Sequence, residues 1–157
     1  MKKFVIFLLI LLFPISMHAA EKIRIFVGIP PMAYLVDKIG GDQVQCRVLL
    51  QPGESPHTFE PTPRQMIDLS KAKYYFRLGF PFESQITRKL GKGRNPEIID
   101  ITEGSKIRHM HSHHSGLDDS GKSEHHDPHV WLSPENISVI ARNMTNALKK
   151  QNRADRN

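Results

Sequence analysis

The sequence predicts an α/β fold with a four-stranded parallel sheet covered by helices on both faces. Short runs rich in isoleucine, valine and aromatic residues alternate along the chain with stretches whose apolar residues recur at helical spacing. These helical stretches are about ten residues long, which suits right-handed crossovers between parallel strands. The chain has 157 residues, enough for one domain of ordinary size with its own core and not for two.

The N-terminus has the pattern of a secretory signal peptide over residues 1–20. Lys2 and Lys3 precede an apolar run, residues 4–15, and small residues follow up to Ala20, after which cleavage is predicted. An uncleaved anchor is the alternative, although a spanning helix needs about 20 apolar residues. The only cysteine, Cys46, lies far beyond this segment, so no lipid-attachment cysteine follows the signal. We expect a mature protein in the periplasm, without an internal disulfide.

The first half of the mature chain predicts a strand, a helix and a second strand. Residues 22–28, KIRIFVG, suit the first strand, which Pro30 and Pro31 interrupt. A helix follows and ends at Gly40 and Gly41. Its apolar positions are Met32, Leu35, Val36 and Ile39. Residues 43–50 form the second strand, and residues 51–63 form a proline-rich loop that includes His57.

The second half continues the alternation. Thr62, with Pro63 next and Gln65 three residues on, predicts a capping-box helix start. Strands are predicted over residues 73–78 and 97–101, with a helix over 82–90 between them. Ser133 and Pro134 begin a last helix. Its apolar face consists of Ile137, Ile140, Ala141, Met144 and Leu148.

Histidines concentrate in residues 109–134, HMHSHHSGLDDSGKSEHHDPHVWLSP. Six of them lie in a polar run: His109, His111, His113, His114, His125 and His126. Clustered histidines in a segment that cannot form a core are typical of metal binding, most often zinc. Their irregular spacing and the intervening serines and glycines define no single tetrahedral shell, so we interpret the run as an auxiliary metal collector or sensor. A solvated histidine-rich loop is the alternative.

His57 and His129 are the predicted primary metal ligands. In an open parallel sheet, ligands bind beyond the carboxyl ends of the strands. His57 follows the second strand and His129 ends the loop after the fourth, so both should emerge at the same edge. Pro56 and Pro128 stiffen the backbone next to these histidines, which lowers the entropy lost on binding. The histidine content favours Zn²⁺, with Mn²⁺ less favoured.

Charge and motifs exclude several other functions. The net charge of +6 falls to about +4 without Lys2 and Lys3, and the basic residues are scattered without interleaved aromatics. We therefore expect no nucleic-acid partner. A zinc-dependent hydrolase using the two histidines and Glu60 is one alternative function, but no HExxH or comparable catalytic motif is present, so the protein is not expected to be an enzyme.

Trp131 is expected to be a core residue.

Three separate motifs occur in one order along the chain. They are IPPMAYLVDKIGG at residues 29–41, LLQPGESPHTFEPTPRQM at 49–66 and DPHVWLSPENI at 127–137, the last preceded by the histidine-rich insertion. In these motifs the chain closely resembles the zinc-binding solute receptors of bacterial ABC transporters, the ZnuA-type members of the TroA-like cluster A-I family. The resemblance covers nearly all of the mature chain.

The resemblance implies two α/β lobes joined by a long helix, with the metal between them. The family's first two histidine ligands fall on His57 and His129, and its third histidine and a carboxylate come from a second lobe, which is absent from this sequence. The implied organisation is a signal peptide at 1–20, a metal-binding lobe at 21–132 with its histidine-rich loop at 104–128, and the start of the inter-lobe helix at 133–157. The implied function is periplasmic zinc capture by a monomer that delivers the ion to a membrane permease. A surface adhesin is an alternative, because family relatives have been described that way.

Overall fold

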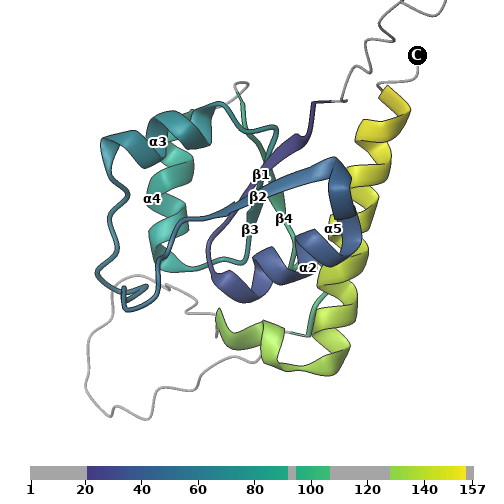
Figure 1. Ribbon diagram of the computed structural model, residues 1–157. Helices are drawn as coiled ribbons and strands as arrows, with labels where there is room; N and C mark the ends of the chain where they lie inside the picture. Colours follow the sequence, from purple (N-terminus) through teal and green to yellow (C-terminus); the bar gives the residue numbers. More distant parts are fainter. Residues whose placement is uncertain (1–20, 92–94, 107–127, 155–157) are drawn as a thin grey trace, which may run out of the picture.

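The computed structural model describes residues 21–91, 95–106 and 128–154 (Figure 1). Its strands are β1 (Ile23–Val27), β2 (Val44–Val48), β3 (Tyr74–Arg77) and β4 (Glu97–Asp100). Its α-helices are α2 (Pro30–Gly40), α3 (Pro63–Ser70), α4 (Pro81–Leu90) and α5 (Pro134–Ala154). Two short 3-10 helices, η1 (Gly41–Gln43) and η2 (Pro128–Leu132), complete the described elements. The predicted signal peptide at residues 1–20 lies outside the described residues.

The four strands form one parallel sheet in the order β2-β1-β3-β4. Figure 1 shows α3 and α4 on one side of the sheet and α2 and α5 on the other. The predicted fold class is therefore confirmed. Because all strands run in the same direction, their carboxyl ends lie at one edge of the sheet and their amino ends at the opposite edge. We call these the carboxyl edge and the amino edge.

The predicted elements are all present, with boundaries shifted by a residue or two. The expectation that Pro30 and Pro31 separate the first strand from the helix was incomplete, because both prolines lie inside the first turn of α2. Proline is well tolerated there, since the first-turn N–H groups have no partner within the helix. At the other end, Gly41 has a φ of 52°, which glycine adopts without steric cost, and the helix stops as predicted.

The predicted capping box at the start of α3 is confirmed. The Thr62 hydroxyl accepts the N–H of Gln65 at 3.2 Å, and the Gln65 side-chain oxygen accepts the N–H of Thr62 at 2.8 Å. Gln65 also donates from Nε2 to the carbonyl of Leu49 at 3.0 Å. One side chain thus caps the helix and ties it to the end of β2, which fixes both ends of the intervening loop.

The core is centred on β1 and β3, the two inner strands. Residues of both strands are buried on both faces of the sheet, as expected for a parallel sheet between two helix layers. The fully buried side chains include Ile25 and Val27 of β1 and Tyr74, Tyr75 and Phe76 of β3. Each such side chain contributes about 1.5–3 kcal/mol by leaving water. The loops at the carboxyl edge are therefore carried by a rigid base.

Helix α5 is longer than its predicted apolar face required. Ile140, Met144 and Leu148 are buried as predicted, Ile137 and Ala141 are half-buried, and Ala147 joins the buried side chains. The Tyr74 hydroxyl donates to the carbonyl of Ala147 at 3.4 Å, which attaches the helix to β3. Among the helices that the structure describes, none combines the length and apolar character that a membrane span requires.

Candidate metal site

His57 lies in the loop that leaves β2 at the carboxyl edge. Two consecutive turns shape the chain before and around it, closed by hydrogen bonds from Glu54 N–H to the Gln51 carbonyl and from Thr58 N–H to the Ser55 carbonyl. The backbone N–H of His57 donates to Ser55 Oγ at 3.3 Å. The imidazole is solvent-exposed. The loop thus holds the backbone of His57 while leaving its ring accessible to an ion.

An aromatic contact anchors the same loop to α4. Phe59, two residues after His57, is buried, and its ring meets that of Phe82 edge to face at a centroid distance of 5.2 Å. Phe82 in turn stacks on Phe80 at 5.6 Å. Because edge-to-face pairs add to the free energy of apolar burial, the position of His57 depends on α4 as well as on its own loop.

His129 lies in η2, just before the last helix. Its side chain is solvent-exposed, whereas the next residue, Val130, is buried. Trp131 is half-buried against the core, in agreement with its expected core role. Its indole Nε1 is buried and has no hydrogen-bond partner among the described residues. Trp131 is also the only tryptophan of the chain, so its fluorescence reports on the surroundings of η2.

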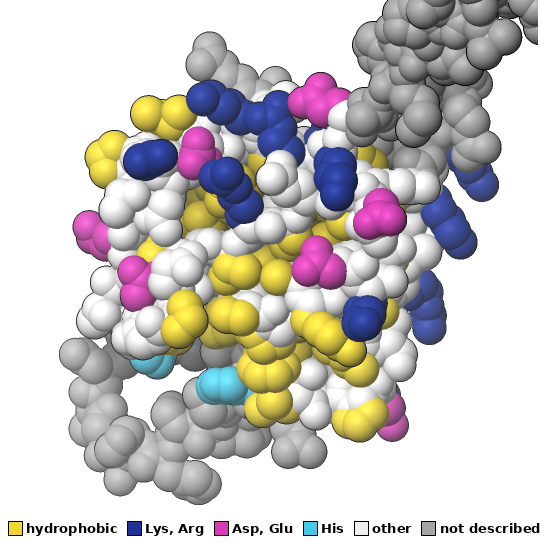
Figure 2. Space-filling model, in the orientation of Figure 1, with side chains coloured by type: hydrophobic (Ala, Val, Ile, Leu, Met, Phe, Trp, Pro, Cys, Tyr) yellow, Lys and Arg dark blue, Asp and Glu magenta, His cyan; other side chains and the backbone are white. Residues whose placement is uncertain are grey.

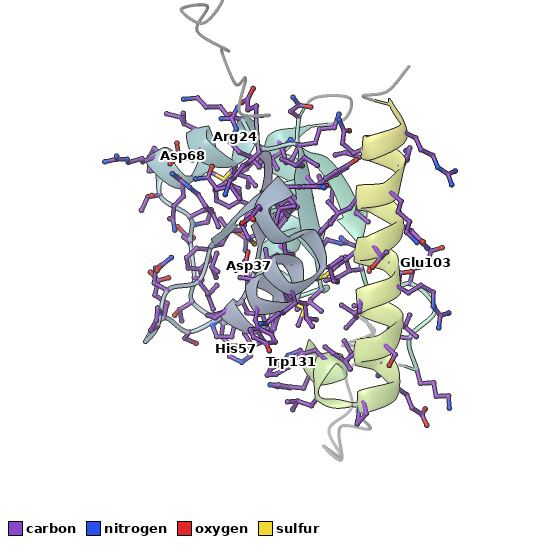
Figure 3. All side chains as sticks on the ribbon, turned by 45° about the vertical axis from the view of Figure 1, so that its right-hand side comes forward. Arg24, Asp37, His57, Asp68, Glu103 and Trp131 are labelled. Carbon is purple, nitrogen blue, oxygen red and sulfur yellow. The ribbon has the colours of Figure 1, made fainter. Side chains whose placement is uncertain are left out.

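The two histidine-bearing segments lie at the same end of the molecule. Figures 1 and 3 both show two segments beyond the carboxyl edge: the loop that follows β2, and the 3-10 helix η2. Figure 3 labels His57 and Trp131 there. Figure 2 shows histidine side chains at this end of the surface, next to hydrophobic ones. The predicted common edge for His57 and His129 is therefore found. Their joint ligation of one ion stays a prediction.

Within the described ranges, no group of three or more histidine, cysteine, aspartate or glutamate side chains is arranged to hold a metal ion. The six auxiliary histidines at positions 109, 111, 113, 114, 125 and 126 lie outside those ranges. Cys46, on β2, is half-buried, and burial raises its pKa to about 12, so its thiolate is not a ready ligand. Among the described residues, the candidate ligands are therefore the two imidazoles of His57 and His129.

The start of α5 fixes the point where the chain leaves the sheet for the histidine-rich segment. The side chain of Asn136, which is buried, accepts the N–H of Lys106 at 2.9 Å and donates to its carbonyl at 3.0 Å. Lys106 Nζ also lies 2.8 Å from Glu135 Oε2. Lys106, the last described residue before the histidine-rich segment, is thus held against α5, the helix that follows His129. This role could not be predicted from the sequence, because a single asparagine at a helix start has no distinctive spacing.

One carboxylate at the carboxyl edge, that of Asp100, is already bound by other protein groups. Arg77 at the end of β3 meets Asp100 at the end of β4 with an Nη2–Oδ2 distance of 2.8 Å, and Asp100 Oδ1 accepts the N–H and hydroxyl of Thr102. Burial raises the pKa of Asp100, but the hydrogen bonds from Thr102 and Arg77 outweigh it and the pKa lies below its ordinary value. This carboxylate stabilises the edge and is not available as a metal ligand.

Glu83 is a buried acidic residue that the sequence analysis missed. Its carboxylate accepts the N–H groups of Leu78 at 3.1 Å, Gly79 at 2.7 Å and Phe80 at 2.8 Å, and the hydroxyl of Tyr75 at 3.1 Å. Burial raises its pKa to about 7, although these hydrogen bonds favour the charged form. Glutamate at the third position of a helix that opens with proline, as in α4, was the signal available in the sequence.

Glu83 fixes the turn between β3 and α4 and constrains a neighbouring strand. A Cβ atom added at Gly28, directly after β1, would lie 2.8 Å from Glu83 Oε1 and 3.3 Å from the Phe82 ring. The glycine therefore allows β1 to approach this carboxylate. Since Phe82 also supports Phe59, the packing of the His57 loop extends back to this buried acid.

Comparison with known proteins identifies one family and several relatives that the chain resembles. The sequence model of one family, described as "ZnuA: Zinc-uptake complex component A periplasmic", matches residues 25–157. The metal ABC transporter substrate-binding lipoprotein FimA of Streptococcus parasanguinis is 25% identical over 140 residues, which are 85% of this chain and 43% of FimA. The manganese ABC transporter substrate-binding lipoprotein PsaA of Streptococcus pneumoniae is 24% identical with the same coverage.

Two solved structures also resemble the chain. A crystal structure of ZnuA is 33% identical with a TM-score of 0.71, and covers 87% of this chain and 49% of its own. A Mn-bound periplasmic metal binding protein from Candidatus Liberibacter asiaticus is 18% identical with a TM-score of 0.67, covering 86% of this chain and 47% of its own, and shows likeness of fold. The chain thus spans less than half the length of each of these relatives.

Proposed function

The chain belongs to the ZnuA family, and from this premise we propose that it captures zinc in the periplasm, as the metal-receiving lobe of a substrate-binding protein that delivers the ion to an ABC permease. The family consists of substrate-binding proteins of ABC transporters, not of enzymes. The observation that supports the proposal most is that His57, in the loop after β2, and His129, in η2, lie at one carboxyl edge. In an open parallel sheet, that edge is where ligands bind.

Zinc is preferred over manganese on chemical grounds. Both primary candidates, His57 and His129, offer imidazole nitrogen, and at nitrogen-rich sites zinc binds more tightly than manganese in the Irving–Williams order. The relatives and neighbours include proteins named for each metal, such as Zn(II)-bound AdcA and the manganese receptor PsaA. The proposed preference for zinc therefore rests on the histidines of this chain, including the auxiliary ones of residues 109–126.

The proposed organisation follows from the same premise. Residues 1–20 are a cleaved signal, residues 21–132 form the metal-binding lobe, and the helix that begins near Ser133 starts the connection between lobes. The protein acts as a monomer without a nucleic-acid partner. The histidine-rich residues 109–126 raise the metal concentration near the two primary ligands instead of defining a fixed shell.

Titration calorimetry with Zn²⁺ and Mn²⁺ tests the proposal. The His57→Ala and His129→Ala variants should each weaken the tightest binding step at least about tenfold, because each removes one ligand. Deletion of residues 109–126 should lower the number of bound ions and leave the tightest step. Thr58→Ala, at an exposed position beside His57, is the matched control and should bind as the wild type does. Equal binding by wild type and both histidine variants would refute the assignment.

Acidity and fluorescence provide a second readout. Because imidazole binds metal only when it is neutral, zinc affinity should fall steadily as the pH is lowered from about 8 to about 5. The fluorescence of Trp131, two residues after His129, should change on zinc addition in the wild type and in Thr58→Ala but not in His129→Ala. Zinc affinity that does not depend on pH would contradict ligation by histidine.

A further inference from the structure

The amino edge of the sheet brings together basic residues that are far apart in the sequence. The N–H of Lys73 donates to the Arg24 carbonyl at 2.8 Å, and the N–H of Glu97 donates to the Lys73 carbonyl at 2.9 Å. Glu97 Oε1 then lies 3.3 Å from Lys150 Nζ near the end of α5. These contacts place β1, the starts of β3 and β4 and the last turns of α5 along one continuous surface.

A small hollow lies within this surface. It has a volume of about 70 Å³ and is lined by Arg24, Arg47 and Lys71, with Asp68 as its carboxylate. Arg47 Nη1 lies 2.9 Å from Asp68 Oδ2, which leaves other guanidinium N–H groups of Arg47 free of this contact. Figure 3 labels Arg24 and Asp68 at this end of the molecule, opposite His57. Figure 2 shows Lys and Arg side chains gathered at the same end.

The surface carries uncompensated positive charge. We define the basic surface as six exposed side chains, Lys22, Arg24, Arg47, Lys71, Lys73 and Lys150. Three of them face a carboxylate: Arg24 faces Glu21, Arg47 faces Asp68 and Lys150 faces Glu97. The other three, Lys22, Lys71 and Lys73, form no ion pair with any side chain in the described ranges. Exposed pairs of this kind are weak, so the paired arginines also retain capacity for a second anion.

We propose that the basic surface docks the protein on the anionic headgroups of a lipid bilayer. Its surplus ammonium groups come from the residue before β1 and from the connection between α3 and β3. They spread along the edge instead of converging on one point, which suits a layer of phosphates better than a single ion. The described chain also enters the fold at this edge, because β1 begins there (Figure 1).

Vesicle binding of the protein as secreted tests the proposal. Vesicles of 30% phosphatidylglycerol in phosphatidylcholine should bind it, and pure phosphatidylcholine vesicles should bind it far more weakly. Each Lys or Arg near an anionic surface changes affinity about fivefold, so Arg24→Gln/Lys71→Gln/Lys73→Gln should weaken binding about 100-fold. Raising NaCl from about 0.1 M to about 0.5 M should also release the wild type, because exposed charges are screened at that ionic strength.

Two controls make the outcome decisive. Lys106→Gln/Arg142→Gln removes exposed charge away from the amino edge and should reduce affinity less than about threefold. Zinc titration of the triple variant should match the wild type, which shows that the variant is folded. The proposal is overturned if the triple variant binds vesicles as the wild type does, or if phosphatidylcholine alone binds equally well. It is also overturned if inorganic phosphate releases the protein at constant ionic strength, since that identifies a free-anion site.

Discussion

Among single residues, Glu83 shows most clearly how the protein tolerates a carboxylate in its interior. Three backbone N–H groups and the Tyr75 hydroxyl point at it, so its hydrogen-bonding capacity is used even though water is excluded. Desolvation nevertheless raises its pKa from 4.5 to about 7. The folded protein therefore holds a proton between pH 4.5 and 7 that the unfolded chain has released.

This difference predicts that stability falls as the pH rises. The contribution of Glu83 is fully present below pH 4.5 and is lost as the pH passes through about 7. Complete loss amounts to about 3 kcal/mol of unfolding free energy. Urea unfolding at several pH values should show this decline in the wild type and in Glu60→Gln, an exposed control, but not in Glu83→Gln. An identical pH dependence in all three proteins would contradict the assignment.

At the scale of elements, the start of α3 controls the loop that carries His57. Gln65 makes two separate contributions there: it completes the capping box with Thr62, and it holds the carbonyl of Leu49 at the end of β2. Helix α4 supports the same loop through the contact between Phe82 and Phe59. The loop is therefore positioned by two helices as well as by its own prolines. The sequence had indicated only the contribution of the prolines.

The double role of Gln65 predicts an order of effects. Thr62→Ala should lower the unfolding free energy by about 1 kcal/mol, the typical loss for an N-cap. Gln65→Ala should cost more, about 2 kcal/mol, because a half-buried carbonyl also loses its partner. Chemical unfolding of both variants, with the exposed Arg64→Ala as control, measures the difference. A larger loss in Thr62→Ala than in Gln65→Ala would show that the Leu49 contact contributes nothing.

At the scale of the whole molecule, the two edges of the sheet have different characters. The carboxyl edge carries the exposed imidazoles of His57 and His129, and the amino edge carries the basic surface with Lys71 and Lys73. An ion that binds His57 and His129 only in the folded protein must stabilise the entire fold, because only the folded chain brings these two segments to one edge of the sheet. The proposed metal site therefore predicts that metal binding and global stability are linked.

This linkage predicts a concentration-dependent melting temperature. Free zinc at about 100 times its dissociation constant should raise the unfolding free energy by about 2.7 kcal/mol. Scanning calorimetry should show the increase in the wild type, its reversal by a chelator, and its absence from the His57→Ala/His129→Ala variant. Stabilisation that persists in the double variant would mean that zinc acts elsewhere on the folded chain.

The elements, their order and the placing of two histidines at one edge of the sheet could all be predicted from the amino-acid sequence. Apolar periodicity, the prolines and glycines at element ends and the Thr62 capping box are local signals, and the rule that parallel strands share a carboxyl edge extended them to His57 and His129. Two hydrogen bonds could not be predicted from the sequence. Glu83 accepts the N–H of Phe80 in the turn before α4, and Asn136 accepts the N–H of Lys106. Single polar residues become important only through the partners they find.

The distribution of charge over the surface, by contrast, depends on how the chain folds. In the sequence the basic residues appear scattered, and no patch was expected. The parallel sheet brings the ends of distant segments to one edge, so that Arg24, Lys71 and Lys73 become neighbours there. Charge interactions depend on distance through space, and distance through space is fixed by strand order and not by position along the chain.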